Sequence, residues 1–447
     1  MIKLEKIELV INNNKKDVYG EVFTHIELIA DILKSIDKRV WQDKNTNFYD
    51  PTCGNGYFLF FVYDILMGNG INYDGYSDID GLKYIIKDDK QREKHIIENM
   101  IYGNDIQQDN IDFCNNMFKS DIYKTNFICH DYMTFDISVF NKPIKNIIGN
   151  PPFQAVMNET GKRKAKNHNL WRPMTEKAFN EIEDGGTISF VCPSSWMSLS
   201  NSNKNMFRLF KENDVIKINI GECDKYFKGV GNNFSFFTIK KKPKTDNTNT
   251  HVICKYKNKI YKSEIKIDID CLPLLITDSS INILKKVVFS DNEKYKIKYD
   301  SYLHAYTKRD IMSDKKDDIH KYRLYHTNNI IKWSQKPHLN QDKWKIMIPR
   351  STYYEKLFIN KGDGTTQSMG YLICDNEIDC EKNKKILLSK LYIYIMKITR
   401  WGNWTSQDIL YRLPKLDINK KWTDQDIYDY FNLTKKEKEE IEIIVNK

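Results

Sequence analysis

A run of asparagine, two prolines and phenylalanine is the first feature of this sequence that could do chemistry. Asn150, Pro151, Pro152 and Phe153 come directly after the apolar residues 147–149, a position expected at the end of a buried strand. The two prolines fix φ and have no N–H, so carbonyl oxygens are left to accept hydrogen bonds. An amine lying flat under Phe153 could donate one hydrogen to the Asn150 side-chain oxygen and one to the Pro151 carbonyl oxygen. Both bonds would draw the nitrogen lone pair out of conjugation and prepare it as a nucleophile.

A glycine loop precedes this run. Residues 50–58 read DPTCGNGYF and follow the short apolar pair Phe48-Tyr49. Gly54 and Gly56 allow a sharp turn from strand to helix and let the amino-acid end of a ligand approach the main chain closely. A similar loop occurs in dinucleotide-binding enzymes, but their third glycine is replaced here by Leu59.

The ribose of a nucleotide-like ligand is normally bound by a carboxylate that accepts hydrogen bonds from its two hydroxyls. This carboxylate usually lies at the end of the strand that follows the glycine loop. Asp105 fits by its setting at the end of the strand-like residues 101–104, and Asp80 is the competitor. Asp80 lies at the more usual distance from the glycine loop. The charged stretch 82–100 reads as a helical insertion that explains the longer spacing to Asp105, so the sequence favours Asp105.

Five segments resemble the motifs of the γ-class adenine-N6 DNA methyltransferases, which use S-adenosylmethionine (SAM). The segments follow one another along the chain in the order of that family. The resemblance covers about the first 240 residues. The segment 150–153 is similar to the catalytic motif of that family and 50–58 to its cofactor loop. The remaining three resemble its N-terminal motif and its two acidic motifs: 19–24, 103–106 and 130–132.

The resemblance implies a role for individual residues. Asn150, Pro151, Pro152 and Phe153 would form the catalytic pocket. Asp131 would accept a hydrogen bond from the adenine amine of SAM. The implied cofactor-binding set is Phe23, Thr24, Asp50, Thr52, Cys53, Gly54, Gly56, Phe58, Asp105, Ile106, Asp131 and Tyr132, with Phe23 and Thr24 closing over the methionine end and Tyr132 or Ile106 sandwiching the adenine ring. The family usually has proline after the threonine, whereas this chain has His25.

Adenine N6 lies inside a DNA duplex, so the target base would have to be flipped into the pocket. Phe153 would then stack on one face of the base. Phe234 or Phe236 could cover the other face, and burial in the core is the alternative for both.

The second half of the chain interleaves basic and aromatic residues, as a DNA recognition domain requires. Lysines would contact phosphates, and arginines could read base edges. The candidates for DNA contact are Phe234, Lys308, Arg309, Arg350 and Arg400.

The alternation of strand-like and helix-like segments predicts an α/β fold: a Rossmann-like SAM-dependent methyltransferase domain followed by a mixed α/β target recognition domain. The polar stretch 240–250 (KKKPKTDNTNT) predicts the boundary between them. The expected domains are 1–244 for catalysis, 251–421 for DNA recognition and 422–447 as a charged C-terminal helix.

Composition sets the remaining limits. The chain of 447 residues has a formal net charge of +10, which suits a polyanionic partner. Its nine cysteines have no zinc-type spacing, so the sequence predicts reduced thiols, no metal site and a cytoplasmic location. The longest apolar run, 58–67, is too short to span a membrane.

These observations predict a SAM-dependent enzyme that methylates N6 of a flipped-out adenine in a specific double-stranded DNA sequence. The chain starts close to the N-terminal motif, which predicts a stand-alone modification enzyme, either protecting DNA beside a separate restriction endonuclease or acting alone. The alternatives are an RNA or protein-glutamine methyltransferase, since Asn-Pro-Pro-aromatic pockets resemble those enzymes too, and a catalytically idle DNA-binding subunit.

Overall fold

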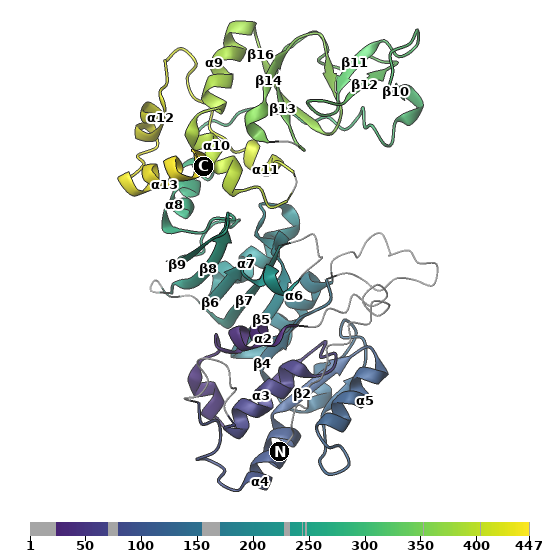
Figure 1. Ribbon diagram of the computed structural model, residues 1–447, viewed down its shortest axis with the longest axis vertical. Coiled ribbons are helices and arrows are strands. Elements are labelled where there is room, and N and C mark those ends of the chain that lie inside the picture. Colours follow the sequence, from purple (N-terminus) through teal and green to yellow (C-terminus); the bar gives the residue numbers. More distant parts are fainter. Residues whose placement is uncertain are drawn as a thin grey trace. The chain divides into compact units, whose positions relative to one another are not determined.

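The chain forms two compact units (Figure 1). The first comprises Met1–Trp196 and Lys204–Asp268, and the second comprises Met197–Asn203 and Ile269–Lys447. The computed structural model describes residues 24–69, 79–153, 170–227, 233–243, 245, 248–351, 353–402 and 404–446.

Nine strands in the described part of the first unit form one sheet, in the order β3-β2-β1-β4-β5-β7-β6-β8-β9. Neighbouring strands from β3 to β5 are parallel, and β7 runs antiparallel to both β5 and β6. The predicted α/β fold with a parallel core is therefore confirmed. The strands are β1 Phe48–Asp50, β2 Ile101–Asp105, β3 Phe127–Cys129, β4 Ile144–Gly149, β5 Ile182–Pro193, β6 Asn213–Ile220, β7 Phe234–Pro243, β8 Thr250–Tyr256 and β9 Lys259–Ile265.

Helix α3 starts directly after the glycine loop. Its N-cap residue, Gly56, has a φ of +76°, and a Cβ there would lie 2.8 Å from Cys114 Sγ, so only glycine fits. The helix is apolar and buried on nearly all sides because it packs against the sheet and against neighbouring helices. The helices of this unit are α2 Ile26–Leu33, α3 Tyr57–Met67, α4 Asp89–Asn99, α5 Gln108–Met117, α6 Trp171–Glu181 and α7 Lys204–Glu212.

The first unit ends later than predicted. Strand β8 pairs in parallel with β6, from Lys217↔His251 to Ile220↔Cys254, and β9 returns beside it as a hairpin. Residues 250–268 thus belong to the first unit, and the boundary falls after Asp268 instead of within 240–250. A polar loop between strands of one sheet has the same composition as a linker between domains, so composition alone misplaced the boundary.

The second unit contains two small sheets, β10-β12-β11-β15 and β14-β13-β16, together with helices. Its strands are β10 Met312–Ser313, β11 Tyr322–Tyr325, β12 Ile331–Ser334, β13 Trp344–Pro349, β14 Phe358–Asn360, β15 Gly364–Thr365 and β16 Met369–Cys374. Its helices are α8 Asp278–Val287, α9 Glu377–Leu387, α10 Lys390–Ile398, α11 Gln407–Leu410, α12 Asp424–Tyr430 and α13 Lys435–Val445.

The charged C-terminal segment is part of this second unit. It forms two helices, α12 and α13, where the sequence predicted one. Glu437 of α13 pairs with Lys286 of α8 at 2.8 Å, and Tyr394 of α10 donates to Glu440. In the part of the chain that the structure describes, no helix is both long and apolar enough to cross a lipid bilayer.

Candidate active site

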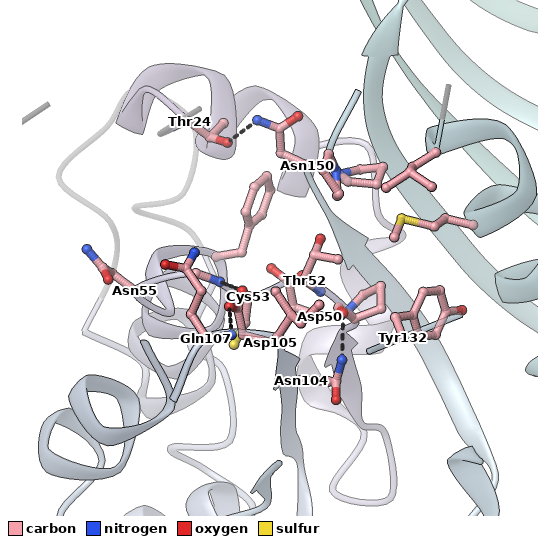
Figure 2. Close-up of a pocket in the computed structure, with 18 of the residues that line it drawn as sticks. Thr24, Asp50, Thr52, Cys53, Asn55, Asn104, Asp105, Gln107, Tyr132 and Asn150 are labelled. Atoms are coloured by element: carbon pink, nitrogen blue, oxygen red, sulfur yellow. Dashed lines mark hydrogen bonds between the residues drawn. The ribbon is translucent and has the colours of Figure 1, made fainter. Parts of the chain in front are cut away.

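Four predicted site residues meet at the carboxyl edge of the sheet. Asp50 ends β1 and Asp105 ends β2, while Asp131 and Asn150 closely follow β3 and β4. Because β1 lies between β2 and β4 and all four strands are parallel, these ends face one crevice. The crevice is a pocket lined by residues of the first unit (Figure 2).

Most of the predicted cofactor and catalytic residues line this pocket. They are Thr24, Asp50, Thr52, Cys53, Gly54, Phe58, Asp105, Ile106, Asp131, Tyr132, Asn150, Pro151, Pro152 and Phe153. Gly56 stands behind the pocket as the N-cap of α3. Phe23 lies outside the described residues.

Asp105 holds the glycine loop. Its Oδ2 accepts the Gly54 N–H at 2.9 Å, and its Oδ1 accepts the Gln107 N–H at 2.9 Å and Asn110 Nδ2 at 3.1 Å. The carboxylate is buried yet faces the pocket, where it can also accept from ligand hydroxyls. Asp80 is exposed and does not line the pocket. The geometry therefore favours Asp105 over Asp80 as the ribose ligand.

Asn104 is a site residue with no role predicted from the sequence. Its side-chain nitrogen donates to the Pro51 carbonyl at 3.1 Å and to the His130 carbonyl at 2.9 Å. The buried amide thus ties the loop after β1 to the loop after β3. The available signal was a second polar residue, beside Asp105, on an otherwise buried strand.

The Asp50 carboxyl group lies at the floor of the site. Burial raises its pKa to about 8, the charge of Asp105 adds to this effect, and the hydrogen bond from the Thr52 N–H at 3.0 Å partly offsets it. Gly149 packs directly against it: a Cβ at this residue, whose φ is +149°, would lie 2.6 Å from Asp50 Oδ1. The site therefore holds a carboxyl group that a positively charged ligand can ionise.

Asn150 and Thr24 meet on the opposite side of the pocket. Asn150 Nδ2 donates to Thr24 Oγ1 at 3.0 Å, and the amide oxygen points the other way (Figure 2). The prolines that follow leave carbonyl oxygens without N–H groups beside them. This end of the pocket therefore offers acceptors suited to an amine.

Phe153 is supported by two buried aromatic rings. Its centroid lies 5.1 Å from that of Phe234 and 6.4 Å from that of Phe227, and those two rings stack on each other at 4.1 Å. Phe234 is buried and does not line the pocket, and Phe236 is buried as well. The prediction that Phe234 contacts DNA is therefore corrected: its ring supports Phe153 from the core, since both faces of β7 are buried over residues 234–239.

The far end of the pocket is suited to an adenine ring. Ile106 is exposed there, and Asp131 accepts the Met133 N–H at 2.9 Å within its loop. Tyr132 is buried, and its hydroxyl donates to Glu181 at 2.6 Å, away from the pocket centre (Figure 2). Of the two residues proposed to sandwich the ring, Ile106 is thus the better placed. Helix α6 also contributes to the lining, which the sequence did not indicate, through Leu170 at its N-cap and Met174.

The parallel sheet, the glycine loop and the carboxylate at the end of β2 together define a SAM-dependent methyltransferase. The lining suits that cofactor: Asp50 can oppose its positive charge, and Asp105 and Asp131 can accept hydrogen bonds from ribose hydroxyls and from the adenine amine. The chain belongs to the N-6 DNA methylase family, whose model matches residues 7–268. The predicted fold class, family and cofactor are therefore confirmed.

Two curated relatives illustrate the distance within this family. The type II methyltransferase M.HincII of Haemophilus influenzae is 22% identical over 253 residues, which cover 54% of this chain and 40% of that protein. The restriction enzyme and methyltransferase RM.BcgI of Heyndrickxia coagulans is 26% identical over 198 residues, covering 43% and 27%. The chain thus spans less than half the length of either relative.

Solved structures extend the likeness of fold over most of the chain. The match to the Type IIL restriction-modification enzyme MmeI covers 90% of this chain and 68% of the MmeI chain, with a TM-score of 0.55 and 12% sequence identity. A nuclease-deletion mutant of the Type ISP enzyme LlaGI covers 89% and 53%, with a TM-score of 0.54 and 12% identity.

The raised pKa of Asp50 predicts that SAM binding releases a proton. At pH 7 a carboxyl group of pKa about 8 is mostly protonated, and a cationic ligand beside it favours the ionised form. We expect nearly one proton to be released per SAM bound at pH 7, and affinity to rise about fivefold from pH 7 to pH 8. Calorimetry in buffers of different ionisation enthalpy measures the release. Asp50→Asn supplies the baseline for protons from SAM itself, and equal release by both proteins would contradict the prediction.

Proposed function

We propose that this protein transfers a methyl group from SAM to N6 of an adenine flipped out of a specific double-stranded DNA sequence. The observation that carries the proposal is the position of Asn150 to Phe153, which follow β4 and line the same pocket as the glycine loop. Family membership and the type II methyltransferase relatives support it.

The residues of the pocket would act mainly by positioning the two reactants. Phe153 would stack on the adenine, and the Asn150 amide oxygen and the Pro151 carbonyl oxygen would each accept one N6 hydrogen. Bound SAM supplies an electrophilic methyl group on a cationic sulfur. As the new N–C bond forms and the S–C bond breaks, the acceptors would stabilise the charge that develops on N6, and one proton then leaves to solvent.

DNA recognition is assigned by this proposal to the second unit. Arg350 lies over the Trp404 ring at 5.3 Å, and Arg400 lies over the Tyr353 ring at 4.9 Å. Stacking of this kind holds a guanidinium flat against the aromatic ring, an arrangement that arginines use in nucleic-acid recognition. Lys308 and Arg309 are exposed. The solved structures of MmeI and LlaGI contain DNA or a DNA substrate mimic, which supports duplex DNA as the substrate here.

Arg350 and Lys308 should behave differently when replaced by alanine. Replacing a stacked arginine that reads a base should cost ~1–3 kcal/mol of binding affinity at one position of the target sequence and little on unrelated DNA. Replacing a lysine that contacts phosphate should weaken binding to all DNA sequences alike and reduce the salt dependence of binding. Fluorescence anisotropy with target and scrambled duplexes measures both effects. Normal binding and methylation by Arg350→Ala and by Arg400→Ala would place recognition elsewhere in the unit.

The experiment that tests the proposed function is methylation of three substrate classes with labelled SAM. We expect label in duplex DNA as N6-methyladenine, mapped to one sequence by sequencing DNA from cells with and without the protein. Label in RNA or in protein glutamine would favour the rival enzymes, and SAM binding without transfer would indicate an idle DNA-binding subunit.

A separate restriction endonuclease of the same specificity is the partner included in this proposal. The relatives that carry the type II designation support it. DNA methylated at the mapped sequence should resist cleavage by that nuclease.

A further inference from the structure

The loop that follows β3, residues 130–135, borders the pocket at the end suited to adenine. Its first four residues, 130–133, line the pocket, and Asp131 is exposed. A carboxylate on an exposed loop binds a ligand well only if the loop is already ordered, because ordering it on binding costs conformational entropy. The contacts that order this loop therefore affect the affinity for the cofactor.

Two side chains of helix α6 hold the loop. Glu181 Oε2 accepts the Tyr132 hydroxyl at 2.6 Å, and Lys177 Nζ donates to the Phe135 carbonyl oxygen at 2.9 Å. Glu181 Oε1 lies 2.7 Å from Lys177 Nζ, so the two anchors also form an ion pair with each other. Their side chains are only 12% and 22% exposed, so solvent screens this pair less than it screens a surface pair. The loop is thus tied to α6 through a side chain and through its main chain.

The Tyr132 ring is enclosed as well. Its centroid lies 6.1 Å from that of the buried Tyr49 ring, in an edge arrangement, and Lys177 Nζ lies 5.3 Å from it. Burial raises the pKa of the Tyr132 hydroxyl, and the charge of Glu181 adds to this effect. The hydroxyl therefore stays protonated and donates to Glu181 at neutral pH.

We propose that Glu181 is a positioning residue for the cofactor. Through the Tyr132 hydroxyl and through Lys177 it would hold Asp131 where that carboxylate accepts the adenine amine of SAM. Glu181 does not itself line the pocket, so its effect is exerted through the loop. The inference rests on the part of the proposed function that places SAM in this pocket, and it holds for any methyl acceptor.

The same helix also borders the pocket directly. Leu170, the N-cap residue of α6, and Met174 belong to the lining, whereas Glu181 is the last residue of the helix. One rigid element therefore forms part of the pocket wall and holds the loop that carries Asp131. This arrangement fixes the adenine end relative to the rest of the pocket before SAM binds.

The test measures the dissociation constant for SAM by calorimetry with variants of the full-length protein. We expect Tyr132→Phe, which removes only the hydroxyl, and Glu181→Ala each to raise the constant about tenfold, since the loop must then be ordered on binding. The double variant should bind no more weakly than Glu181→Ala, because both changes break the same hydrogen bond. Glu181→Gln keeps an acceptor for the hydroxyl, so its constant should rise less than about threefold.

Glu212→Ala is the matched control. Glu212 is the last residue of α7 in the same unit, and it pairs with Arg208 four residues earlier at 2.9 Å, as Glu181 pairs with Lys177 on α6. It does not line the pocket. The affinity of Glu212→Ala for SAM should equal that of the parental protein.

Two further measurements separate positioning from a structural role. Loss of the ion pair should lower the thermal unfolding temperature of Glu181→Ala in either case, whereas only positioning changes the affinity for SAM. At saturating SAM the single-turnover methylation rate should stay within about twofold of the parental rate, because residues 150–153 are unchanged.

Parental affinity in both Tyr132→Phe and Glu181→Ala, or losses that simply add in the double variant, would overturn the role of Glu181 and leave the proposed function intact. Failure of the parental protein to bind SAM would instead overturn the placement of the cofactor in this pocket.

Discussion

Replacing Asn150 with alanine should reduce methylation of DNA by ~10²-fold or more, the scale expected for loss of a transition-state hydrogen bond. The alanine removes the amide oxygen that would accept one N6 hydrogen and the amide nitrogen that donates to Thr24. Single-turnover rates with saturating SAM and target duplex measure the effect. The loss should appear in the rate of the chemical step, with a smaller change in affinity for DNA.

Binding of SAM is the internal control for this variant. The contacts of the glycine loop run through Asp105 and Asn104, so the dissociation constant for SAM should change by less than about threefold. A parental methylation rate in Asn150→Ala would mean that the catalytic pocket is misassigned. A large loss of SAM binding would mean that the substitution disturbs the cofactor site as well.

The second large effect is expected at Asp105. Its replacement by alanine removes the acceptor for the Gly54 N–H and for any ribose hydroxyl, and it removes the hydrogen bonds that Asp105 accepts from the Gln107 N–H and from Asn110. We expect the dissociation constant for SAM to rise on the order of 100-fold, about 2.7 kcal/mol, as for other buried hydrogen-bonded charges. Calorimetric titration with SAM measures it.

Asp80→Ala is the matched control, because Asp80 is the competing carboxylate of the sequence and is exposed outside the pocket. Its affinity for SAM should equal that of the parental protein. Weak binding by Asp80→Ala together with normal binding by Asp105→Ala would exchange the two assignments.

The parts of the site that could be predicted depend on local rules. Two such features can be recognised within a few residues of sequence. One is a glycine that adopts a positive φ, as Gly56 does, and the other is a polar residue at the end of a buried strand. Parallel strands bring the residues at their carboxyl ends to one edge of the sheet. Asp50, Asp105 and Asn150 could therefore be placed in one pocket from the sequence.

The features that could not be predicted depend on pairing between distant segments. Phe234 has the same sequence signature as an exposed aromatic residue. Its ring is buried because β7 lies between β5 and β6 inside the sheet and both faces of the strand are covered there. Strand β8 belongs to the first unit because it pairs in parallel with β6. Likewise, Lys345 gives no sign in the sequence that it is buried under three carbonyl groups.

The short segment Met197–Asn203 belongs to the second unit although it lies within the sequence of the first. Its Met197 carbonyl accepts the Leu272 N–H at 2.9 Å, and Asn203 donates to the Ser198 carbonyl at 2.8 Å. If the second unit carries DNA recognition as proposed, its exchange between related genes by a single crossover after Asp268 would separate this segment from the residues that it packs with. A chimera that exchanges the whole second unit needs three junctions, after Trp196, Asn203 and Asp268, so that Met197–Asn203 and Ile269–Lys447 come from the same parent.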